Sequence, residues 1–238
     1  MKHFSLPLFS GSRLTLLFAL LLVPLLLTQT ACADSPAGQS ATNNAAQTAA
    51  NAAKAAAARK RITDNPLAPK YAPKGYDVTI VEYFDYQCPY CRKMYPALAK
   101  LRASDKKVRI VYRDLPIFGD ASVEAAHAAI ASNWQGKHAA FHAALMTVPG
   151  KLNSKKIRQA ADKAGVNWAR LQRDLKVHAK EIDALLDSTR QEAMMMGLTG
   201  TPALLIGPYL VPGAMNYEQL TKAVALTRKY PDGNAPQS

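Results

Sequence analysis

The sequence predicts an α/β fold in which a block of helices interrupts the sheet. Three patterns lead to this prediction. The β-rich run "YDVTIVEYF" (76–84) is followed by helical spacing and by a second β-rich run, "KKVRIVYRDLPI" (106–117). About seventy-five residues of helical periodicity come next, and strand-type residues return in "TPALLIGPYLVPG" (201–213). Both ends of the folded region therefore supply strands, and the middle supplies helices.

Residues 1–33 have the features of a secretory signal peptide. Lys2 and Arg13 precede the apolar run "LTLLFALLLVPLLL", and Ala31-Cys32-Ala33 supplies the small residues that a signal peptidase needs. We expect cleavage after Ala33 and export to the periplasm, and the run is too short for a confident membrane span. Lipidation of Cys32 is the alternative, although Gln29 stands where that modification usually has leucine.

Residues 34–70 are a low-complexity, alanine-rich tail followed by a proline-rich lead-in. The stretch "ATNNAAQTAANAAKAAAARKR" lacks bulky apolar residues, so it cannot bury a core and favours a flexible spacer. Alanine also has the highest helix propensity, and a solvated or oligomerising helix is the competing interpretation. "DNPLAPKYAPKG" (64–75) predicts an extended segment.

The remaining elements divide into two half-domains and an insertion. Residues 71–118 form the first half, in which "CRKMYPALAKLRA" places Met94, Leu98 and Leu101 on one helical face. The strands on either side of that helix should run parallel, with a right-handed crossover. Residues 119–196 form the helical insertion. Residues 197–231 form the second half, a hairpin and a closing helix, and residues 232–238 are a tail.

The charge balance limits the partners. The chain has 30 basic and 17 acidic residues, a net charge of +13, which we read as spread along the chain with its densest points at "ARKR" and "NSKKIRQ". An exported protein has little access to nucleic acid. The charge is therefore consistent with non-specific attraction to anionic membrane surfaces or acidic clients.

Cys88 and Cys91 could hold a metal, close a structural loop or carry redox chemistry. A zinc site needs four ligands, and the sequence has no second cysteine pair. His138 and His142 share a helical face but have no acid or cysteine beside them, so we interpret them as packing or surface residues. We therefore expect no metal. A disulfide across so short a loop would constrain the unfolded chain little.

Redox chemistry explains the position of the pair better. Cys88 stands at a strand-to-helix junction, where the helix N-terminus favours a thiolate. Cys91 lies one turn further on and can form or resolve a disulfide with it. Arg92 and Lys93 add positive charge nearby.

Two acids precede the cysteines. Glu82 lies on a strand that otherwise looks buried, so it is either solvent-facing or a desolvated carboxylate with a raised pKa that exchanges protons with Cys91. Asp85 is expected to cap the helix or to order the loop before it.

"VEYFDYQCPYC" resembles the active-site strand and motif of the thioredoxin superfamily, and within it the bacterial periplasmic DsbA-like branch. The helical insertion has the size and place that it has in that family, and Pro96 falls where the family kinks its active-site helix. "GLTGTPALLIG" resembles the loop whose cis-proline faces the disulfide. The resemblance runs from about Tyr76 to Tyr230 and implies a thioredoxin-like fold with a helical insertion domain.

The resemblance also implies roles for individual residues. Cys88 would be the exposed attacking sulfur and Cys91 the buried resolving one. Pro202 would be the cis-proline, with the Thr201 backbone pairing with an extended client segment. Pro89 and Tyr90 would also contact the substrate. No cofactor is expected apart from the redox-active disulfide Cys88–Cys91, and the partners would be exported thiol proteins and a membrane redox partner that resets the disulfide.

The direction of electron flow stays open at this point. The Pro-Tyr dipeptide and Thr201 resemble the isomerase and reductase branch called DsbG and DsbC. Residues 34–70 are too short and too alanine-rich to form the N-terminal dimerisation domain of that branch. A helical trimerising tail, as in the copper-resistance relatives called ScsC, is the alternative for this segment. A copper-handling protein is the alternative function, because Met94 and the run Met194, Met195 and Met196 offer soft sulfur ligands. Core or groove packing is the competing interpretation of those methionines.

Overall fold

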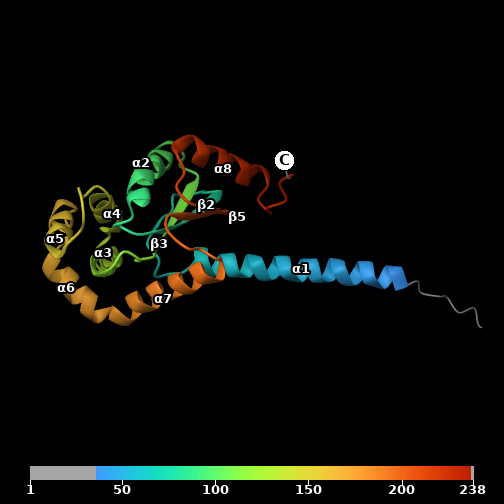
Figure 1. Ribbon diagram of the computed structural model, residues 1–238, viewed down its shortest axis with the longest axis horizontal. Helices are drawn as coiled ribbons and strands as arrows, with labels where there is room; N and C mark the ends of the chain where they lie inside the picture. The colour runs from blue at the N-terminus through green and yellow to red at the C-terminus, as the bar shows by residue number, and fades with distance from the viewer. Residues whose placement is uncertain (1–35, 237–238) are drawn as a thin grey trace, which may run out of the picture. The chain divides into compact units, whose positions relative to one another are not determined.

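The computed structural model describes residues 36–236, and Figure 1 shows its helices and strands. The predicted signal peptide, its cleavage site and Cys32 lie outside the described residues. The helices are α1 (Pro36–Thr63), α2 (Pro89–Ser104), α3 (Asp120–Ser132), the short 3-10 helix η1 (Asn133–Gln135), α4 (His138–Met146), α5 (Ser154–Lys163), α6 (Trp168–Val177), α7 (Ala179–Met195) and α8 (Tyr217–Lys229).

One mixed sheet carries the fold. Its strands are β1 (Lys70–Tyr71), β2 (Val78–Phe84), β3 (Val108–Asp114), β4 (Ala203–Ile206) and β5 (Tyr209–Pro212), in the spatial order β1-β3-β2-β4-β5. β2 and β3 are parallel, as the strand–helix–strand pattern predicts, and the other pairs are antiparallel. Helices α3 to α7 lie between β3 and β4 in the chain, so the predicted thioredoxin-like fold with a helical insertion is confirmed.

Alternation along the two central strands directs side chains to opposite faces of the sheet. On one face α2 and α8 pack together above the strands (Figure 1). On the other face α7 crosses β3. There the guanidinium of Arg113, which is fully buried, donates hydrogen bonds to the Glu192 carboxylate and the Ser188 hydroxyl, and the Tyr83 hydroxyl donates to Glu192 at 3.0 Å. This buried ion pair joins the sheet to the last helix of the insertion.

The hairpin between β4 and β5 bends at Gly207 and Pro208, as the sequence predicts. Gly207 has a φ of +54°, and a Cβ atom there would lie 2.4 Å from Cγ2 of Thr227 on α8. Glycine therefore allows both the turn and the close approach of the closing helix.

The alanine-rich segment is helical, and the prediction of a flexible spacer is wrong. Residues 36–63 form α1, and the side chains described between 43 and 57 are exposed. Alanine's helix propensity decides the conformation because no proline or glycine interrupts the segment after Gly38, and a helix of this length can form without a buried face.

The last turn of α1 packs against the sheet. Ile62 is buried, and the Arg109 guanidinium on β3 donates hydrogen bonds to the Thr63 carbonyl and to Asp64 and Tyr76. The ion pair with Arg109 and Lys60 holds the pKa of Asp64 down at about 2. This end of the helix is therefore part of the folded domain.

Candidate active site

The two cysteines lie where β2 passes into α2. Cys88 is the N-cap residue of α2 with an extended backbone, and Pro89 occupies the first helical position, where no N–H is needed. Both thiols are free. Cys91 is completely buried, and burial raises the pKa of its thiol. The Cys88 sulfur thus lies at the N-terminus of α2, and the desolvated Cys91 sulfur lies one turn further along the helix.

Cys88 is less accessible than the resemblance implies. Its residue is only 1% exposed, and its Sγ donates a hydrogen bond to the Thr201 carbonyl at 3.2 Å. The Thr201–Pro202 peptide bond is cis, as the resemblance implies, and Pro202 is buried. The expectation of an exposed Cys88 is corrected because the Thr201–Pro202 loop covers the sulfur. Pro89 and Tyr90 are exposed beside it, Tyr90 to 63%.

Asp85 orders the loop before the cysteines. Its carboxylate accepts hydrogen bonds from four donors, at 2.6 to 3.0 Å: the Gln87, Ile117 and Phe118 backbone N–H groups and the Ser122 hydroxyl. These donors come from the loop itself, from the segment after β3 and from α3. One buried carboxylate therefore connects the active-site loop to the start of the helical insertion, and it does not cap α2.

Arg92 is held by backbone carbonyl groups. Its guanidinium donates hydrogen bonds to the carbonyls of Tyr86, Val148 and Gly150, at 2.6 to 2.9 Å. These contacts fix the loop after α4 against the active-site loop. Its charge is thus engaged by carbonyl groups, and Lys93 lines a groove on α2.

Glu82 is buried on β2, and its charge acts on the Cys91 thiol. It is 1% exposed, its Oε1 has no hydrogen-bond partner among the described residues, and desolvation raises its pKa to about 8. It faces a cavity of about 10 Å³, which is about enough for one water molecule. Tyr95, Arg102 and His142 also line this cavity. A carboxyl group in this setting can bind and release a proton near neutral pH.

A second buried acid, Asp114, lies at the end of β3 and was not identified from the sequence. It is 3% exposed, and neither carboxylate oxygen has a partner among the described residues. Burial raises its pKa well above the usual range, and repulsion from Asp85 and Glu82 adds to the effect. The only sequence signal is an acid at the end of a β-rich run.

The two histidines of α4 pack in the core, which is the first of the two positions that the sequence left open. Burial lowers the pKa of His138 to about 3 and that of His142 well below its usual value. His142 lies edge-on to Phe84, and its Nδ1 is 3.1 Å from the Tyr86 hydroxyl. Within residues 36–236 no group of three or more histidine, cysteine or acidic side chains could hold a metal ion.

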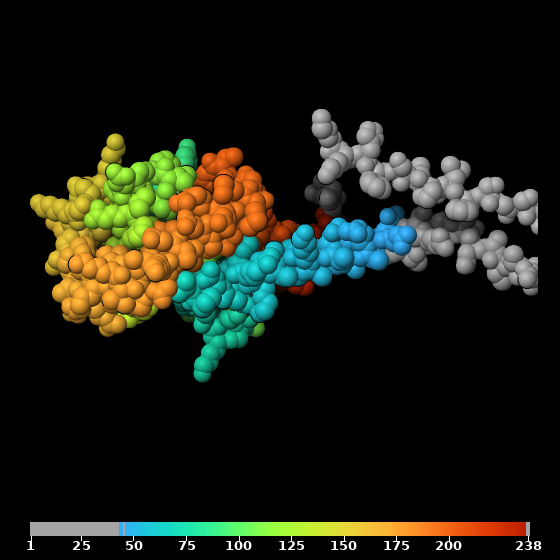
Figure 2. Space-filling view, turned by 90° about the horizontal axis from the view of Figure 1, so that it is seen from below, coloured from blue at the N-terminus to red at the C-terminus, as the bar shows by residue number. Residues whose placement is uncertain are grey.

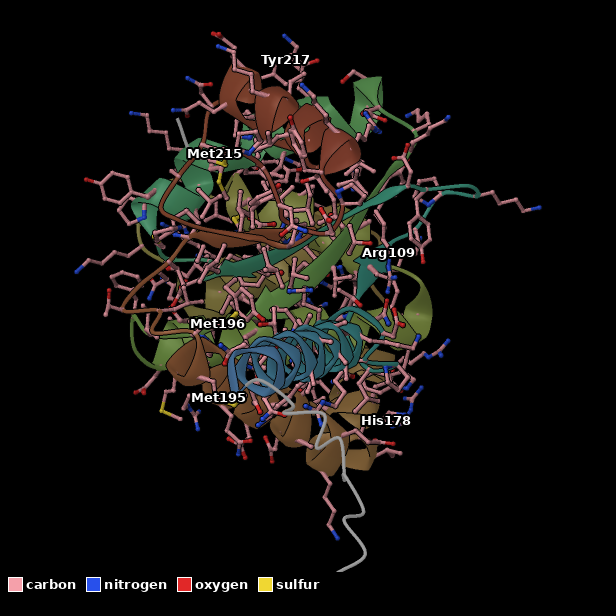
Figure 3. All side chains as sticks on the ribbon, turned by 90° about the vertical axis from the view of Figure 1, so that its right-hand side faces the viewer. Arg109, His178, Met195, Met196, Met215 and Tyr217 are labelled. Carbon is pink, nitrogen blue, oxygen red and sulfur yellow. The ribbon has the colours of Figure 1, made fainter. Side chains whose placement is uncertain are left out.

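The methionines form two separate groups. Met194 and Met195 at the end of α7 are 65% and 79% exposed, so core packing does not describe them. Met94 lies on the buried face of α2, and its sulfur accepts a hydrogen bond from the Met215 N–H at 3.5 Å. Figure 3 shows Met215 well separated from Met195 and Met196. The two groups cannot share one metal ion in this arrangement.

An apolar groove of about 660 Å³ begins at the active site and runs between α2 and α8. Its apolar walls include Tyr90, Met94, Pro96, Met215 and Tyr217. Lys93 and Lys100 add two positive charges to the lining. Tyr90, which stands between the two cysteines in the sequence, lines the groove, so the groove borders the cysteine motif.

Comparisons with known proteins place the fold in a family. The model of the DSBA-like thioredoxin domain family matches residues 79–225. A thioredoxin-like oxidoreductase from Silicibacter pomeroyi is 40% identical, with 72% of this chain and 98% of that chain covered and a TM-score of 0.68. A periplasmic thioredoxin-like protein from Salmonella enterica serovar Typhimurium is 28% identical, with 71% and 94% covered and a TM-score of 0.62. The thiol-disulfide exchange protein α-DsbA2 from Wolbachia pipientis is 27% identical, with 76% and 97% covered and a TM-score of 0.69.

The chain also matches part of a curated membrane protein. It is 29% identical to the Na(+)/H(+) antiporter NhaA 3 of Salinispora tropica over 185 residues, which is 71% of this chain and 26% of the antiporter. The chain thus spans about a quarter of the length of this relative. Among residues 36–236, no helix is apolar and long enough to cross a bilayer.

Proposed function

The chain belongs to the DsbA-like thioredoxin domain family, and from that premise we propose that it is a periplasmic enzyme that exchanges disulfides with exported proteins. The observation that carries the proposal is the placement of Cys88 at the N-terminus of α2, with its sulfur against the Thr201 carbonyl and with Cys91 buried one turn inside. The predicted signal peptide and the likeness to a periplasmic thioredoxin-like protein support the location.

The exchange proceeds through a mixed disulfide. When the protein acts as a reductant, the Cys88 thiolate attacks one sulfur of a client disulfide, and the other client sulfur leaves as a thiolate that takes up a proton. Cys91 then loses its proton and attacks Cys88, so the Cys88–Cys91 disulfide forms and the second client thiol is released. The client gains two electrons and two protons. Oxidation of a client dithiol is the same sequence reversed.

Glu82 is proposed to accept the proton that Cys91 must lose. Burial raises the pKa of the Cys91 thiol, so the attack needs a base that works in a desolvated site. Glu82 has a pKa of about 8 and faces a cavity that can hold a water molecule. A base with this pKa is close to balanced at neutral pH and can take a proton in one direction of the reaction and return it in the other.

Clients are proposed to bind across the Thr201–Pro202 loop and in the groove between α2 and α8. The Thr201 backbone offers the hydrogen-bonding groups of an extended strand next to Cys88. The groove supplies apolar surface, and its two methionines adapt to side chains of different shape. Such a site suits unfolded segments with apolar residues near a cysteine.

The direction of catalysis is a separate question that the reduction potential answers. A potential near about −120 mV would make the Cys88–Cys91 pair a donor of disulfides, and one near about −200 mV would make it an isomerase or reductase. The test is equilibration of the purified protein with glutathione buffers, together with turnover of reduced and of scrambled ribonuclease. If the Cys88→Ser variant turns over either substrate as fast as the unchanged protein, the proposal is wrong.

A further inference from the structure

The positive charge of the chain is concentrated in one segment of the insertion, which carries α5, α6 and the residues that flank them. Residues 151–180 contain nine basic and two acidic residues, a net charge of +7, which is more than half of the +13 of the whole chain. The interpretation that the charge is spread along the chain is therefore corrected, although one of its two densest points, "NSKKIRQ", lies in this segment. Figure 1 shows α5 and α6 at the outer edge of the insertion, away from β5 and α8, and Figure 2 shows them forming one end of the folded domain.

The fold leaves this charge on the surface. Both acids of the segment are paired within their own helices, Asp162 with Arg158 and Asp174 with Arg170. Six further basic side chains are exposed and make no ion pair with any residue in the described part of the chain: Lys151, Lys155, Lys163, Arg173, Lys176 and Lys180. We call these six residues the basic ridge.

The surface around the ridge is amphipathic. On α6, Arg170, Arg173 and Lys176 recur every three residues and lie on one side of the helix, whereas Leu171 is completely buried on the other. Val177 follows Lys176 and is 74% exposed, among the most exposed large apolar side chains of the described chain. An apolar side chain surrounded by cations is the pattern of a helix that lies at the interface of an anionic bilayer.

We propose that α5 and α6 dock the protein on anionic phospholipid membranes. Five of the six ridge residues are lysines, which act as mobile point charges and suit a diffuse field of lipid headgroups better than fixed bidentate recognition of a protein carboxylate. Val177 would enter the headgroup region. The basic ridge and Val177 would attach the protein to the bilayer independently of Cys88 and the groove between α2 and α8.

The test measures binding of residues 34–238 to phosphatidylcholine vesicles with and without phosphatidylglycerol, by sedimentation. The unchanged protein should bind only the anionic vesicles, and binding should be lost at about 1 M NaCl, where the Debye length is about 3 Å. Replacing Lys155, Arg173 and Lys176 by Gln should lower the partition coefficient about a hundredfold, and each single replacement about fivefold.

A matched control removes the same charge elsewhere. Lys74, Lys106 and Lys107 are exposed residues outside the insertion, and their joint replacement by Gln should lower the partition coefficient far less. Disulfide turnover of a soluble client should be unchanged in both triple variants, which also shows that they fold.

Two outcomes would overturn the proposal. Equal losses in the two triple variants would show that only net charge matters. Tighter binding of poly-aspartate than of anionic vesicles, with no effect of Val177→Gln on vesicle binding, would assign the ridge to an acidic protein partner instead.

Discussion

Replacing Glu82 by Gln should change how the stability of the fold depends on pH. The carboxyl group ionises at a pKa of about 8 in the fold and about 4.5 in the unfolded chain. As the pH rises, the unfolded state therefore releases this proton before the folded state does. The free energy of unfolding is highest below pH 4.5, where both states hold the proton, and it falls as the pH rises towards 8. At pH 7 the loss amounts to roughly 3 kcal/mol.

The amide introduced by Glu82→Gln cannot ionise, so this loss disappears in the variant. An amide left without partners costs about 1–3 kcal/mol, but that cost is the same at every pH. The measured quantity is therefore the difference in unfolding free energy between Glu82→Gln and the unchanged protein, followed from pH 4.5 to pH 7. We expect this difference to move by about 3 kcal/mol in favour of the variant over that interval.

The assay is urea unfolding of the fully reduced proteins at several pH values. Glu218→Gln is the control, because that residue is exposed on α8 and its one ion pair within the described residues is with Lys222, which is also exposed, so its effect should stay within about 0.5 kcal/mol throughout. A difference for Glu82→Gln that does not change with pH would show that Glu82 is not a desolvated acid. It would also remove the argument for Glu82 as the proton acceptor of Cys91.

Four further outcomes are expected. Iodoacetamide should modify Cys88 before Cys91, as read by peptide mass spectrometry, because burial raises the pKa of Cys91; the reverse order would exchange their roles. Asp85→Ala should cost about 3 kcal/mol or more in urea unfolding, because four hydrogen bonds lose their acceptor. Pro202→Thr should trap mixed disulfides with clients on non-reducing gels. Removing residues 34–47 should leave the oligomeric state by light scattering unchanged, because the exposed part of α1 has no apolar stripe; a fall to a smaller assembly would show that it oligomerises.

The strands and the active-site helix could be predicted because their patterns are local. β2 and β3 are rich in β-branched and aromatic residues, and Met94, Leu98 and Leu101 repeat at helical spacing. The same local argument failed for α1, where the absence of bulky apolar residues was weighed above the helix propensity of alanine.

The contacts that the sequence did not predict join distant residues. Asp85 accepts hydrogen bonds from residues more than thirty positions away, and Arg113 pairs with Glu192, 79 positions away. No periodicity in the sequence reports such pairs. The basic ridge was missed for another reason, since charges counted along the chain do not show which ones a fold leaves on one surface.

The sulfur atoms of the groove make it sensitive to oxidants other than disulfides. Conversion of Met94 or Met215 to the sulfoxide would add a polar oxygen to an apolar wall and weaken its hold on apolar segments. Met194 and Met195, which are far more exposed, would meet peroxide in the surrounding solution first. They would be oxidised first while the groove stays reduced, which would delay chemical damage at the surface that we propose for client binding.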